Sequence, residues 1–362
     1  MKSLFLENIT IVNYKNIESK KFKLDQKINC FIGNNGVGKT NILDSIYHLS
    51  SGKSYFNSIN SQSIKHNENY MFIEGDFKKD NEIENIICSL KRGKKKTLKR
   101  NGKAYKKFSE HIGLIPLVMI SPSDRDLIQE GSSLRRKFLD NIISQNNKIY
   151  LKNLINYNKV LIQRNALLKF FNKSNSFDID NLTIYNDQIS ELSVPIYETR
   201  KQFFESFKPV FSKYYDLISQ SSESIVINYE SQLDFESMDK LLENSINKDR
   251  ILQFTSCGIH KDDLTMNIEG YPIKKYGSQG QQKSLLIALK LAQFEYLKAE
   301  FNSSPILLLD DIFDKLDNNR VKQLISLVNN NLFGQIFISD TDLDRTNKII
   351  SDIDSTSKVF NV

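Results

Sequence analysis

Hydrophobic residues at the start of the chain occur in short runs of the kind found in β-strands. Such runs cover residues 4–12, 22–24 and 28–32, and the last of them stops abruptly at Gly33. After Thr40 the apolar residues fall at helical spacing, at positions 42, 43, 46, 47 and 49. The pattern therefore predicts a strand, a glycine-containing loop and a helix in direct succession.

Residues 70–120 have the pattern of antiparallel strands. Residues 71–77 and 83–90 are expected to form two of them, and Asn101-Gly102 is expected to form a two-residue hairpin turn. This segment predicts an antiparallel β region after the first helix.

Long apolar stripes at helical spacing replace this pattern between residues 134 and 252. The polar stretch 172–180 separates two stripes, which predicts a helical hairpin or paired arms. A β-type pattern returns after Ile251, a further helix is expected from Ser284, and residues 306–309 read as a buried strand that ends in acids. We therefore predict an α/β lobe formed by residues 1–122 and 253–362, with residues 123–252 inserted as a helical lobe.

The composition is that of a soluble globular protein. The 362 residues include 50 basic and 43 acidic side chains, a net charge of +7 that permits a polyanionic partner without requiring one. No apolar run approaches the roughly 20 residues that span a bilayer, and Glu7 interrupts the N-terminal run before a signal-peptide core could form. The three cysteines lie far apart, which excludes a zinc ribbon and disfavours a disulfide framework. We expect a cytoplasmic protein that does not contact the membrane.

Residues 33–40 match the pattern G-x-x-x-x-G-K-[ST] of a phosphate-binding loop, between a strand and a helix as this pattern requires. The loop consists of Gly33, Asn34, Asn35, Gly36, Val37, Gly38, Lys39 and Thr40. Its glycines allow backbone N–H groups to turn toward phosphate oxygens, and the following helix presents its positive N-terminus to the same charge. Lys39 is expected to reach the β- and γ-phosphates, and the Thr40 hydroxyl is expected to bind Mg²⁺.

Two adjacent acids follow the apolar strand 306–309. Asp310 is our candidate for the carboxylate that completes the Mg²⁺ shell, and Asp311 is placed to orient or deprotonate an attacking water as a general base. We therefore assign catalysis to Lys39 and Asp311. Two acids at the end of a strand could instead form an ordinary solvated turn, but the upstream phosphate-binding loop favours the functional interpretation.

A second glycine-containing loop, residues 276–283, precedes the helix expected from Ser284. Ser278, Gly280 and Gln281 could bind an anion at the helix N-terminus, and because one nucleotide has only one triphosphate, such a site would be completed by another subunit. The alternative is a solvent-exposed loop that caps the helix.

Residues 91–107 contain ten Lys or Arg and no acid. These residues could protect the edge of a β-sheet, or they could contact the phosphates of a nucleic acid. Our candidate DNA contacts are Lys91, Arg92, Lys94, Lys95, Lys96, Lys99 and Arg100. No base-reading motif is visible, so recognition would involve the backbone and the structure of the nucleic acid.

The order of these motifs, followed by Phe313-Asp314-Lys315-Leu316-Asp317, resembles the ABC-type ATPase heads of the structural-maintenance-of-chromosomes (SMC) and DNA-repair class. The resemblance implies an ABC-type P-loop ATPase lobe with an antiparallel β subdomain, in addition to the inserted helical lobe. It also implies that the Ser278 loop binds the γ-phosphate held by an opposite subunit, and that residues 314–317 lie at the interface of an ATP-dependent homodimer.

More specific strings resemble the RecF family of bacterial recombination mediators. These are Ser121-Pro122-Ser123-Asp124, the Arg135-Arg136-Lys137-Phe138-Leu139-Asp140 segment and the Gly258-Ile259-His260-Lys261-Asp262-Asp263-Leu264 segment. Without the resemblance, Arg135 and Arg136 would read as an exposed helix start and His260 as a hydrogen-bonded structural histidine. Two positions depart from common ABC patterns: Asp311 replaces the usual glutamate, and Asp340-Thr341 occupies the place of a histidine, for which we assign no role.

The resemblance implies a cytoplasmic protein that dimerises on ATP and hydrolyses it weakly, with stimulation by DNA. It further implies binding to duplex DNA near single-strand gaps and cooperation with RecO and RecR to load RecA, in DNA repair, replication-fork maintenance and the SOS response. An alternative is an ATPase subunit coupled to a nuclease, but the four histidines are scattered and no metal-ligand cluster is apparent. The ATPase subunit of a transporter is disfavoured by the 239 positions between Lys39 and Ser278 (278 − 39).

Overall fold

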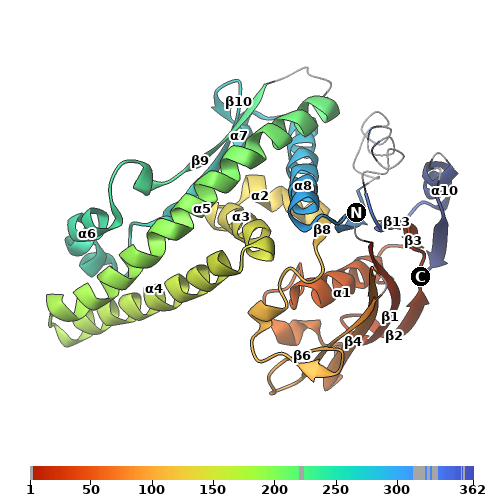
Figure 1. Cartoon of the computed structure of the whole chain (residues 1–362), viewed down its shortest axis with the longest axis horizontal. Helices are drawn as coiled ribbons and strands as arrows, with labels where there is room; N and C mark the ends of the chain where they lie inside the picture. The colour runs from red at the N-terminus through yellow and green to blue at the C-terminus, as the bar shows by residue number, and fades with distance from the viewer. Residues whose placement is uncertain are drawn as a thin grey trace. The chain divides into compact units, whose positions relative to one another are not determined.

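A computed structural model describes residues 3–362, with the exception of residues 81, 220–223, 313–322, 324–326, 328–332, 352 and 354. The chain forms two compact units, whose helices and strands are shown in Figure 1. Unit 1 comprises Met1–Arg125, Tyr214–Ser221 and Lys283–Val362, and unit 2 comprises Asp126–Lys213 and Ser222–Gln282.

The division between the units differs from the prediction at its second boundary. We expected the inserted lobe to span residues 123–252, but residues 253–282 also belong to unit 2. They contain β10 (Asp263–Ile268) and β11 (Tyr271–Pro272), and β10 pairs with β9 (Ile225–Glu230) of the same unit. Because these strand pairs join segments on both sides of residue 252, the boundary falls later in the chain.

Unit 1 contains an antiparallel sheet with the strand order β2-β1-β4-β5-β6-β7. Its strands are β1 (Leu4–Tyr14), β2 (Ile17–Lys23), β4 (Tyr70–Lys79), β5 (Glu82–Lys91), β6 (Thr97–Arg100) and β7 (Lys103–Ala104). The predicted turn is confirmed: Asn101 and Gly102 have φ angles of 49° and 78° and join β6 to β7 in a two-residue hairpin.

Unit 1 also contains a parallel sheet with the strand order β14-β3-β13-β12-β8. Its strands are β3 (Ile28–Ile32), β8 (Leu117–Ile120), β12 (Ile306–Asp310), β13 (Ile336–Asp340) and β14 (Ser357–Asn361), and α10 (Leu343–Ser351) lies between β13 and β14 in the chain. β3, β8, β12 and β13 are buried along their whole length, which explains their nearly continuous apolar sequences. The buried strand predicted at residues 306–309 is confirmed as β12.

The helix α1 (Lys39–Ser51) contacts strands of both sheets and is buried around most of its circumference. Even Asp44 on this helix is fully buried. Its carboxylate accepts hydrogen bonds from the Tyr14 hydroxyl at 2.5 Å and the Tyr55 N–H at 2.6 Å, and it pairs with the Lys15 ammonium at 2.7 Å. The helix that follows the glycine loop is therefore held by both apolar packing and satisfied polar contacts.

A buried glutamine connects the two sheets. The side chain of Gln335, just before β13, accepts from the Leu6 N–H at 2.7 Å and donates to the Leu6 carbonyl at 2.8 Å and the Asp25 carbonyl at 2.7 Å. These bonds satisfy backbone groups of β1 that would otherwise be buried without a partner. They also fix the start of β13 relative to the antiparallel sheet.

Unit 2 is mainly helical. Its helices are α2 (Asp126–Gln129), α3 (Ser132–Asn146), α4 (Lys148–Ser174), most of α5 (Ile179–Ser219), α6 (Met238–Leu252) and α7 (Ile273–Tyr276). The predicted break at residues 172–180 is confirmed as the turn between α4 and α5, where Leu168, Phe171 and Leu182 pack together. The helical interpretation was wrong for β9, because this short strand is stabilised by pairing with β10, far away in the sequence.

Cys30, Cys88 and Cys257 are buried and free. No helix in the described parts of the chain is both long and apolar enough to cross a bilayer.

Candidate functional site

The parallel sheet brings the predicted nucleotide-binding residues together. β3, β13 and β12 are neighbours that run in the same direction, so their carboxyl ends meet at one edge of the sheet. This edge holds the loop that begins at Gly33, Asp340 at the end of β13, and Asp310 and Asp311 at the end of β12. Ligands of open parallel sheets bind at such an edge.

The loop before α1 adopts the left-handed backbone that its glycines permit. Gly36 and Gly38 have φ angles of 85° and 112°. Asn16, in the turn between β1 and β2, donates through Nδ2 to the Gly36 carbonyl at 2.8 Å and accepts from Asn41 Nδ2 at 2.7 Å. A Cβ on Gly38 would lie 2.8 Å from Asn16 Oδ1. Asn16 thus supports the loop, and no pattern in the sequence pointed to it.

Lys39 is buried at the first position of α1 and faces back into the loop. Its ammonium donates to the Gly33 carbonyl at 2.7 Å and to the Asn34 carbonyl at 2.8 Å. An ammonium has three N–H donors. Two of them therefore hold the loop in shape, and one remains for an anion that the loop would surround.

Thr40 and Asp310 lie in direct contact, although 270 positions separate them in the chain. The Thr40 hydroxyl donates to Asp310 Oδ1 at 2.8 Å, the Ser339 hydroxyl donates to the same oxygen at 2.7 Å, and Ser121 Oγ lies 3.4 Å from Oδ2. Burial raises the pKa of the Asp310 carboxyl above its usual value. A buried carboxylate beside a hydroxyl is a donor set of the kind that suits a hard cation such as Mg²⁺.

Within the described residues no group of three or more His, Cys, Asp or Glu side chains could hold a metal ion. Mg²⁺ is commonly bound by one or two protein oxygens together with phosphate oxygens and water. The residues Thr40 and Asp310 therefore fit a cation that arrives with a phosphate ligand.

Asp311 occupies an unusual backbone conformation. Its φ is 48°, in the left-handed region, and its N–H lies 3.0 Å from Ser339 Oγ. Its Oδ1 is buried and has no hydrogen-bond partner among the residues that the structure describes. A buried carboxylate oxygen without a partner is costly, so this oxygen is suited to accept a hydrogen bond from a water or ligand at the same sheet edge.

Asp340 has contacts of its own. Its carboxylate accepts from the Thr341 N–H at 2.6 Å and the Asp342 N–H at 3.0 Å, and it pairs with Arg345. These contacts hold the turn that leads from β13 to α10. The sequence alone did not assign a role to this position.

The second glycine-containing loop is shorter than predicted, because α8 (Gln279–Phe301) begins five residues before Ser284. The Gln281 N–H donates to Ser278 Oγ at 3.2 Å, and the Ser278 N–H donates to Gln281 Oε1 at 2.6 Å. This reciprocal pair is a capping box, which stabilises an early helix start. The loop therefore caps its own helix, and Ser278 is exposed at the helix end.

Residues 313–317, which we expected at the interface between two subunits, lie outside the described residues.

Two of the strings that resemble the RecF family, residues 135–140 and 258–264, meet in unit 2 around a buried arginine, Arg200 of α5. Its guanidinium pairs with Asp140 at 2.8 Å and Asp262 at 2.7 Å and donates to the Ile259 carbonyl at 2.8 Å. Asp140 is the last residue of the 135–140 string, and Asp262 lies within the 258–264 string. The two strings are thus parts of one polar network, and the sequence did not reveal the arginine between them.

The interpretation of Arg135 as an exposed residue is wrong. Arg135 forms a bidentate pair with Asp263 at 2.7 and 2.9 Å, and its side chain is 15% exposed. Arg136 donates to the Asp262 carbonyl at 2.5 Å. Both arginines therefore attach α3 to the start of β10, although more than 120 positions separate the two segments in the chain.

His260 is a hydrogen-bonded structural histidine, as its type alone predicted. Its Nε2 faces the Thr255 carbonyl at 3.0 Å, and its Nδ1 lies 2.7 Å from the Tyr157 hydroxyl. Since a carbonyl only accepts, Nε2 must carry the proton and Nδ1 must accept from Tyr157 in the neutral ring. Burial lowers the pKa of His260 to about 4.

We expect the low pKa of His260 to make the fold sensitive to acid. The unfolded chain binds a proton at the ordinary histidine pKa of about 6.5, whereas the folded chain does so only near 4, so stability is present above pH 6.5 and declines as the pH falls toward 4. The loss attributable to this residue is on the order of 3 kcal/mol. Urea unfolding of His260→Gln and wild type at pH 7 and pH 4.5 measures it.

The variant should show a smaller decline in stability between the two pH values than the wild type. His66→Gln, a change at an exposed histidine, controls for the loss of a histidine as such. An equal decline in wild type and His260→Gln would contradict the assignment.

Lys96, one of the predicted DNA contacts, is tied into the protein. Its ammonium donates to the Gly52 carbonyl and to Asn60 Oδ1 at 2.9 Å, and it lies 5.3 Å from the centre of the Phe108 ring. Burial lowers its pKa. These contacts anchor the loop between β5 and β6 to the end of α1.

Two further members of the basic run have structural partners. The Arg92 Nε donates to the Glu68 carbonyl at 2.7 Å, and Arg100 forms a bidentate pair with Glu84. Together with Lys96 they hold the hairpin in shape. The basic run therefore divides into residues that build the hairpin and residues that remain available.

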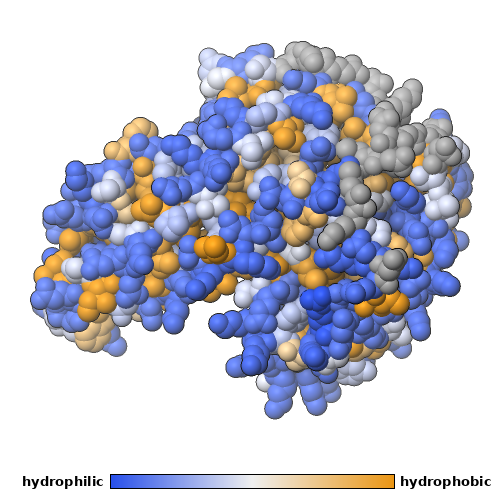
Figure 2. Space-filling view, in the orientation of Figure 1, coloured by the Kyte–Doolittle hydropathy of each residue, from blue (hydrophilic) through white to orange (hydrophobic). Residues whose placement is uncertain are grey.

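The available residues are Lys91, Lys94, Lys95 and Lys99, for which no hydrogen bond or ion pair to another described side chain occurs. Two surface pockets are lined in part by Lys91, Lys94 and Lys95. Figure 2 shows that hydrophilic residues dominate the surface over β4 and β6 in the view drawn. This surface of unit 1 is a candidate for binding a polyanion.

Comparison with known proteins covers the whole chain. Residues 5–361 match the family described as RecF/RecN/SMC N terminal domain. The chain is 55% identical to the DNA replication and repair protein RecF of Flavobacterium johnsoniae, over 99% of this chain and 100% of that protein. It is 46% identical to the protein of the same name from Phocaeicola vulgatus, over 99% and 96% of the two chains.

Solved structures show the same similarity. The fold is similar to that of the recombination mediator protein RecF-ATP of the RecFOR pathway, with a TM-score of 0.87, 33% identity, and coverage of 94% of this chain and 92% of that chain. It is also similar to an Smc head bound to a domain of ScpA, with a TM-score of 0.57 and 16% identity, which indicates a shared fold only.

Proposed function

The chain belongs to the RecF family of DNA replication and repair proteins, and from this premise we propose that it is an ATP-dependent DNA-binding recombination mediator. It would dimerise on ATP, bind DNA at single-strand gaps in the cytoplasm and, with RecO and RecR, promote the loading of RecA in repair, fork maintenance and the SOS response. The observation that carries this proposal is the contact between Thr40 and Asp310, which joins the phosphate-binding loop to the acidic strand end.

The sheet edge has the groups that ATP binding requires. We propose that the backbone N–H groups of residues 33–40 surround the β- and γ-phosphates and that Lys39 contributes its third N–H to them. Thr40 and Asp310 would hold Mg²⁺, which neutralises charge on the phosphates when bound. Support for ATP as the nucleotide comes from the RecF-ATP structure that this chain resembles.

Asp311 is suited to position water at the γ-phosphate, since its Oδ1 is buried and lacks a partner. An aspartate is one methylene shorter than the glutamate common in ABC ATPases. A small displacement of the attacking water costs rate, so we propose a weak ATPase that DNA stimulates, with hydrolysis acting as a switch. Within the described residues no metal-binding cluster favours the nuclease-coupled alternative.

The test of the proposed function is the mass of the protein in solution, with and without ATP and Mg²⁺ and with and without a gapped duplex. We expect a monomer without ATP and a dimer with it, and a stronger shift to the dimer on the gapped DNA. A monomer that binds ATP but never dimerises, or a protein that binds no DNA in any nucleotide state, would overturn the proposal.

Ser278→Arg should separate nucleotide binding from dimerisation. Ser278 is exposed at the start of α8, where a second copy could contact it, and the longer charged side chain would obstruct a γ-phosphate held by that copy. The variant should bind ATP within about twofold of the wild type and stay monomeric by light scattering. Because Arg at this position also removes the capping box, Ser278→Ala serves as the control for loss of the cap alone. An ATP-dependent dimer of Ser278→Arg would show that the loop does not act between subunits.

Lys94→Glu combined with Lys95→Glu should weaken DNA binding. Both lysines lie on the loop after β5, and their ammonium groups have no partner among the described side chains, so their loss removes phosphate contacts without removing such a contact. We expect affinity for duplex DNA to fall roughly tenfold. The slope of log affinity against log salt concentration should also become shallower, by the amount that about two phosphate contacts contribute. Fluorescence anisotropy over a range of salt concentrations measures both.

Lys20→Glu combined with Lys21→Glu is the matched control, since it makes the same charge change on exposed residues of β2 in the same sheet. If the Lys94/Lys95 variant has the same salt dependence of DNA binding as the wild type, the hairpin does not contact DNA.

A further inference from the structure

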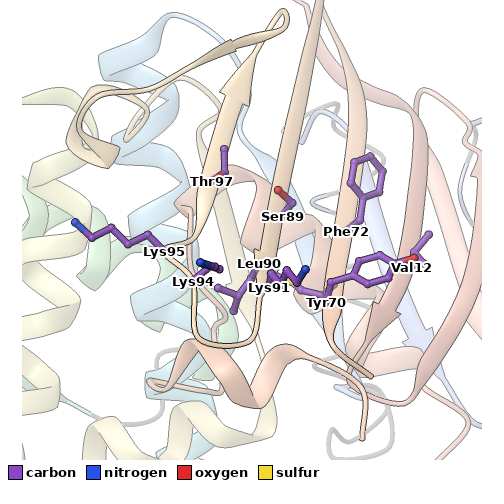
Figure 3. A pocket seen from close by; sticks show the side chains of 10 residues that line it. Val12, Tyr70, Phe72, Ser89, Leu90, Lys91, Lys94, Lys95 and Thr97 are labelled. Atoms are coloured by element: carbon purple, nitrogen blue, oxygen red, sulfur yellow. The ribbon is translucent and has the colours of Figure 1, made fainter. Parts of the chain in front are cut away.

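One face of the antiparallel sheet of unit 1 carries an aromatic pocket that the nucleotide site does not use. Along β4, Met71 and Ile73 point into the core and are fully buried, so Tyr70 and Phe72 project from the opposite face. Tyr70 is 48% exposed. Together with Val12 of β1, these residues line a surface pocket (Figure 3).

The charged residues that line this pocket are all basic. Lys91, Lys94 and Lys95 line it, and no acidic side chain does. Figure 3 shows Lys94 and Lys95 on the loop between β5 and β6, with the Lys95 side chain extending away from the rings of Tyr70 and Phe72 on β4. The ligand that the charges favour is therefore an anion, and the ligand that the rings favour has a flat apolar surface.

The loop that presents these lysines is fixed at its base. Lys96 is bonded to Gly52 and Asn60, and Arg92 is bonded to Glu68, so the loop is anchored on both sides of Lys94 and Lys95. The Lys94 N–H also donates to the Lys91 carbonyl at 3.0 Å, which forms a turn. The backbone that carries these lysines at the pocket is thus held by contacts that do not involve their own ammonium groups.

We propose that this pocket, which we call the sheet pocket, binds unpaired nucleotides of single-stranded DNA. A base would stack on Tyr70 and Phe72, and the flanking phosphates would contact Lys94 and Lys95. Stacking requires a base whose face is accessible, and the bases of a duplex cover each other's faces. The pocket therefore deepens the proposed function, on which it rests, because it would distinguish the single-stranded part of a gap from the duplex beside it.

A protein partner is the less favoured occupant. All the charged residues of the lining are lysines, whereas protein interfaces are depleted in lysine relative to the rest of the surface. The combination of a basic groove with aromatic rings is typical of single-strand binding.

The test measures binding of wild type, Tyr70→Ala and Phe72→Leu to oligo-dT, to a gapped duplex and to a blunt duplex, all with ATP and Mg²⁺. Phe72→Leu removes the ring but keeps an apolar side chain on the sheet, and Tyr70→Phe keeps the ring as the conservative rescue. Phe235→Ala, a change at an aromatic residue of unit 2 that is 92% exposed, is the matched control.

We expect the ring-deleting variants to bind oligo-dT roughly tenfold more weakly, with the blunt duplex unaffected and the salt dependence unchanged, since no phosphate contact is removed. Tyr70→Phe and Phe235→Ala should bind as the wild type does. A fluorescent base analogue in the oligonucleotide should be quenched by the wild type and less so by Tyr70→Ala.

If the wild type and both ring-deleting variants bind oligo-dT with equal affinity, the proposal that the sheet pocket binds single-stranded DNA is wrong. An equal loss for single-stranded and blunt DNA would also overturn it, because it would indicate a structural effect. A change in ATP-dependent mass without a change in DNA binding would assign this face to contacts between copies of the chain. In each of these outcomes the wild type still binds DNA with ATP, whereas a wild type that binds no DNA would refute the proposed function itself.

Discussion

Lys39→Ala is expected to weaken ATP binding by about 100-fold or more. The ammonium is the only side-chain cation found within the described part of the phosphate-binding loop, and it bonds the Gly33 and Asn34 carbonyls that shape the loop. Alanine removes both the charge that would meet the phosphates and the two bonds that hold the loop around them. Titration with a fluorescent ATP analogue measures the affinity.

Lys20→Ala, a change at an exposed lysine of β2 in the same unit, is the control and should bind ATP normally. Circular dichroism should show that Lys39→Ala keeps its fold. Normal ATP affinity in Lys39→Ala would refute the assignment of residues 33–40. Because dimerisation is proposed to depend on ATP, the variant should also remain monomeric when ATP is added.

Arg200→Ala is expected to destabilise the protein by about 3–5 kcal/mol. Arg200 is 2% exposed and pairs with Asp140 and Asp262. Without the guanidinium, two carboxylates would remain close together in a site of low polarity, and burial already raises the pKa of Asp262. The Ile259 carbonyl would also lose its donor. Urea unfolding followed by circular dichroism measures the change.

Lys201→Ala, at the next residue of α5, is the matched control, since its pair with Asp234 is exposed and its loss should have little effect. If Arg200→Ala does not accumulate as folded protein, Arg200→Lys keeps the charge, loses the forked geometry and should fall between wild type and alanine. Equal stability of Arg200→Ala and Lys201→Ala would show that the network contributes nothing.

The phosphate-binding loop could be predicted because its geometry is encoded locally. Glycines at positions 36 and 38 are needed where φ is positive, Lys39 must open the helix, and a strand must precede the loop. The hairpin turn at Asn101-Gly102 was predictable for the same reason, since both residues tolerate positive φ. Family-specific strings then indicated the RecF family, which the comparisons confirm.

Several features depended on partners distant in the chain. The strand β9 exists because it pairs with β10, and its own sequence lay inside a helical pattern. Asn16 supports the phosphate-binding loop from the turn between β1 and β2. Arg200 joins the 135–140 and 258–264 strings, and neither string indicated this arginine. The basic run looked uniform, but only the fold separates Lys96, which anchors the hairpin, from Lys94 and Lys95, which remain available.

The sequence alone determined the class of the protein: an α/β nucleotide-binding fold, the loop that would hold the phosphates, the acids that would serve a metal and an attacking water, and the family. These depend on short segments whose residue types restrict backbone conformation and chemistry. The tertiary structure decided which charged residues are bonded inside the protein and which face solvent, where the second unit ends, and that aromatic residues of β4 line a pocket beside free lysines. Burial and pairing are properties of contacts between distant segments, so they appear only when the chain is folded.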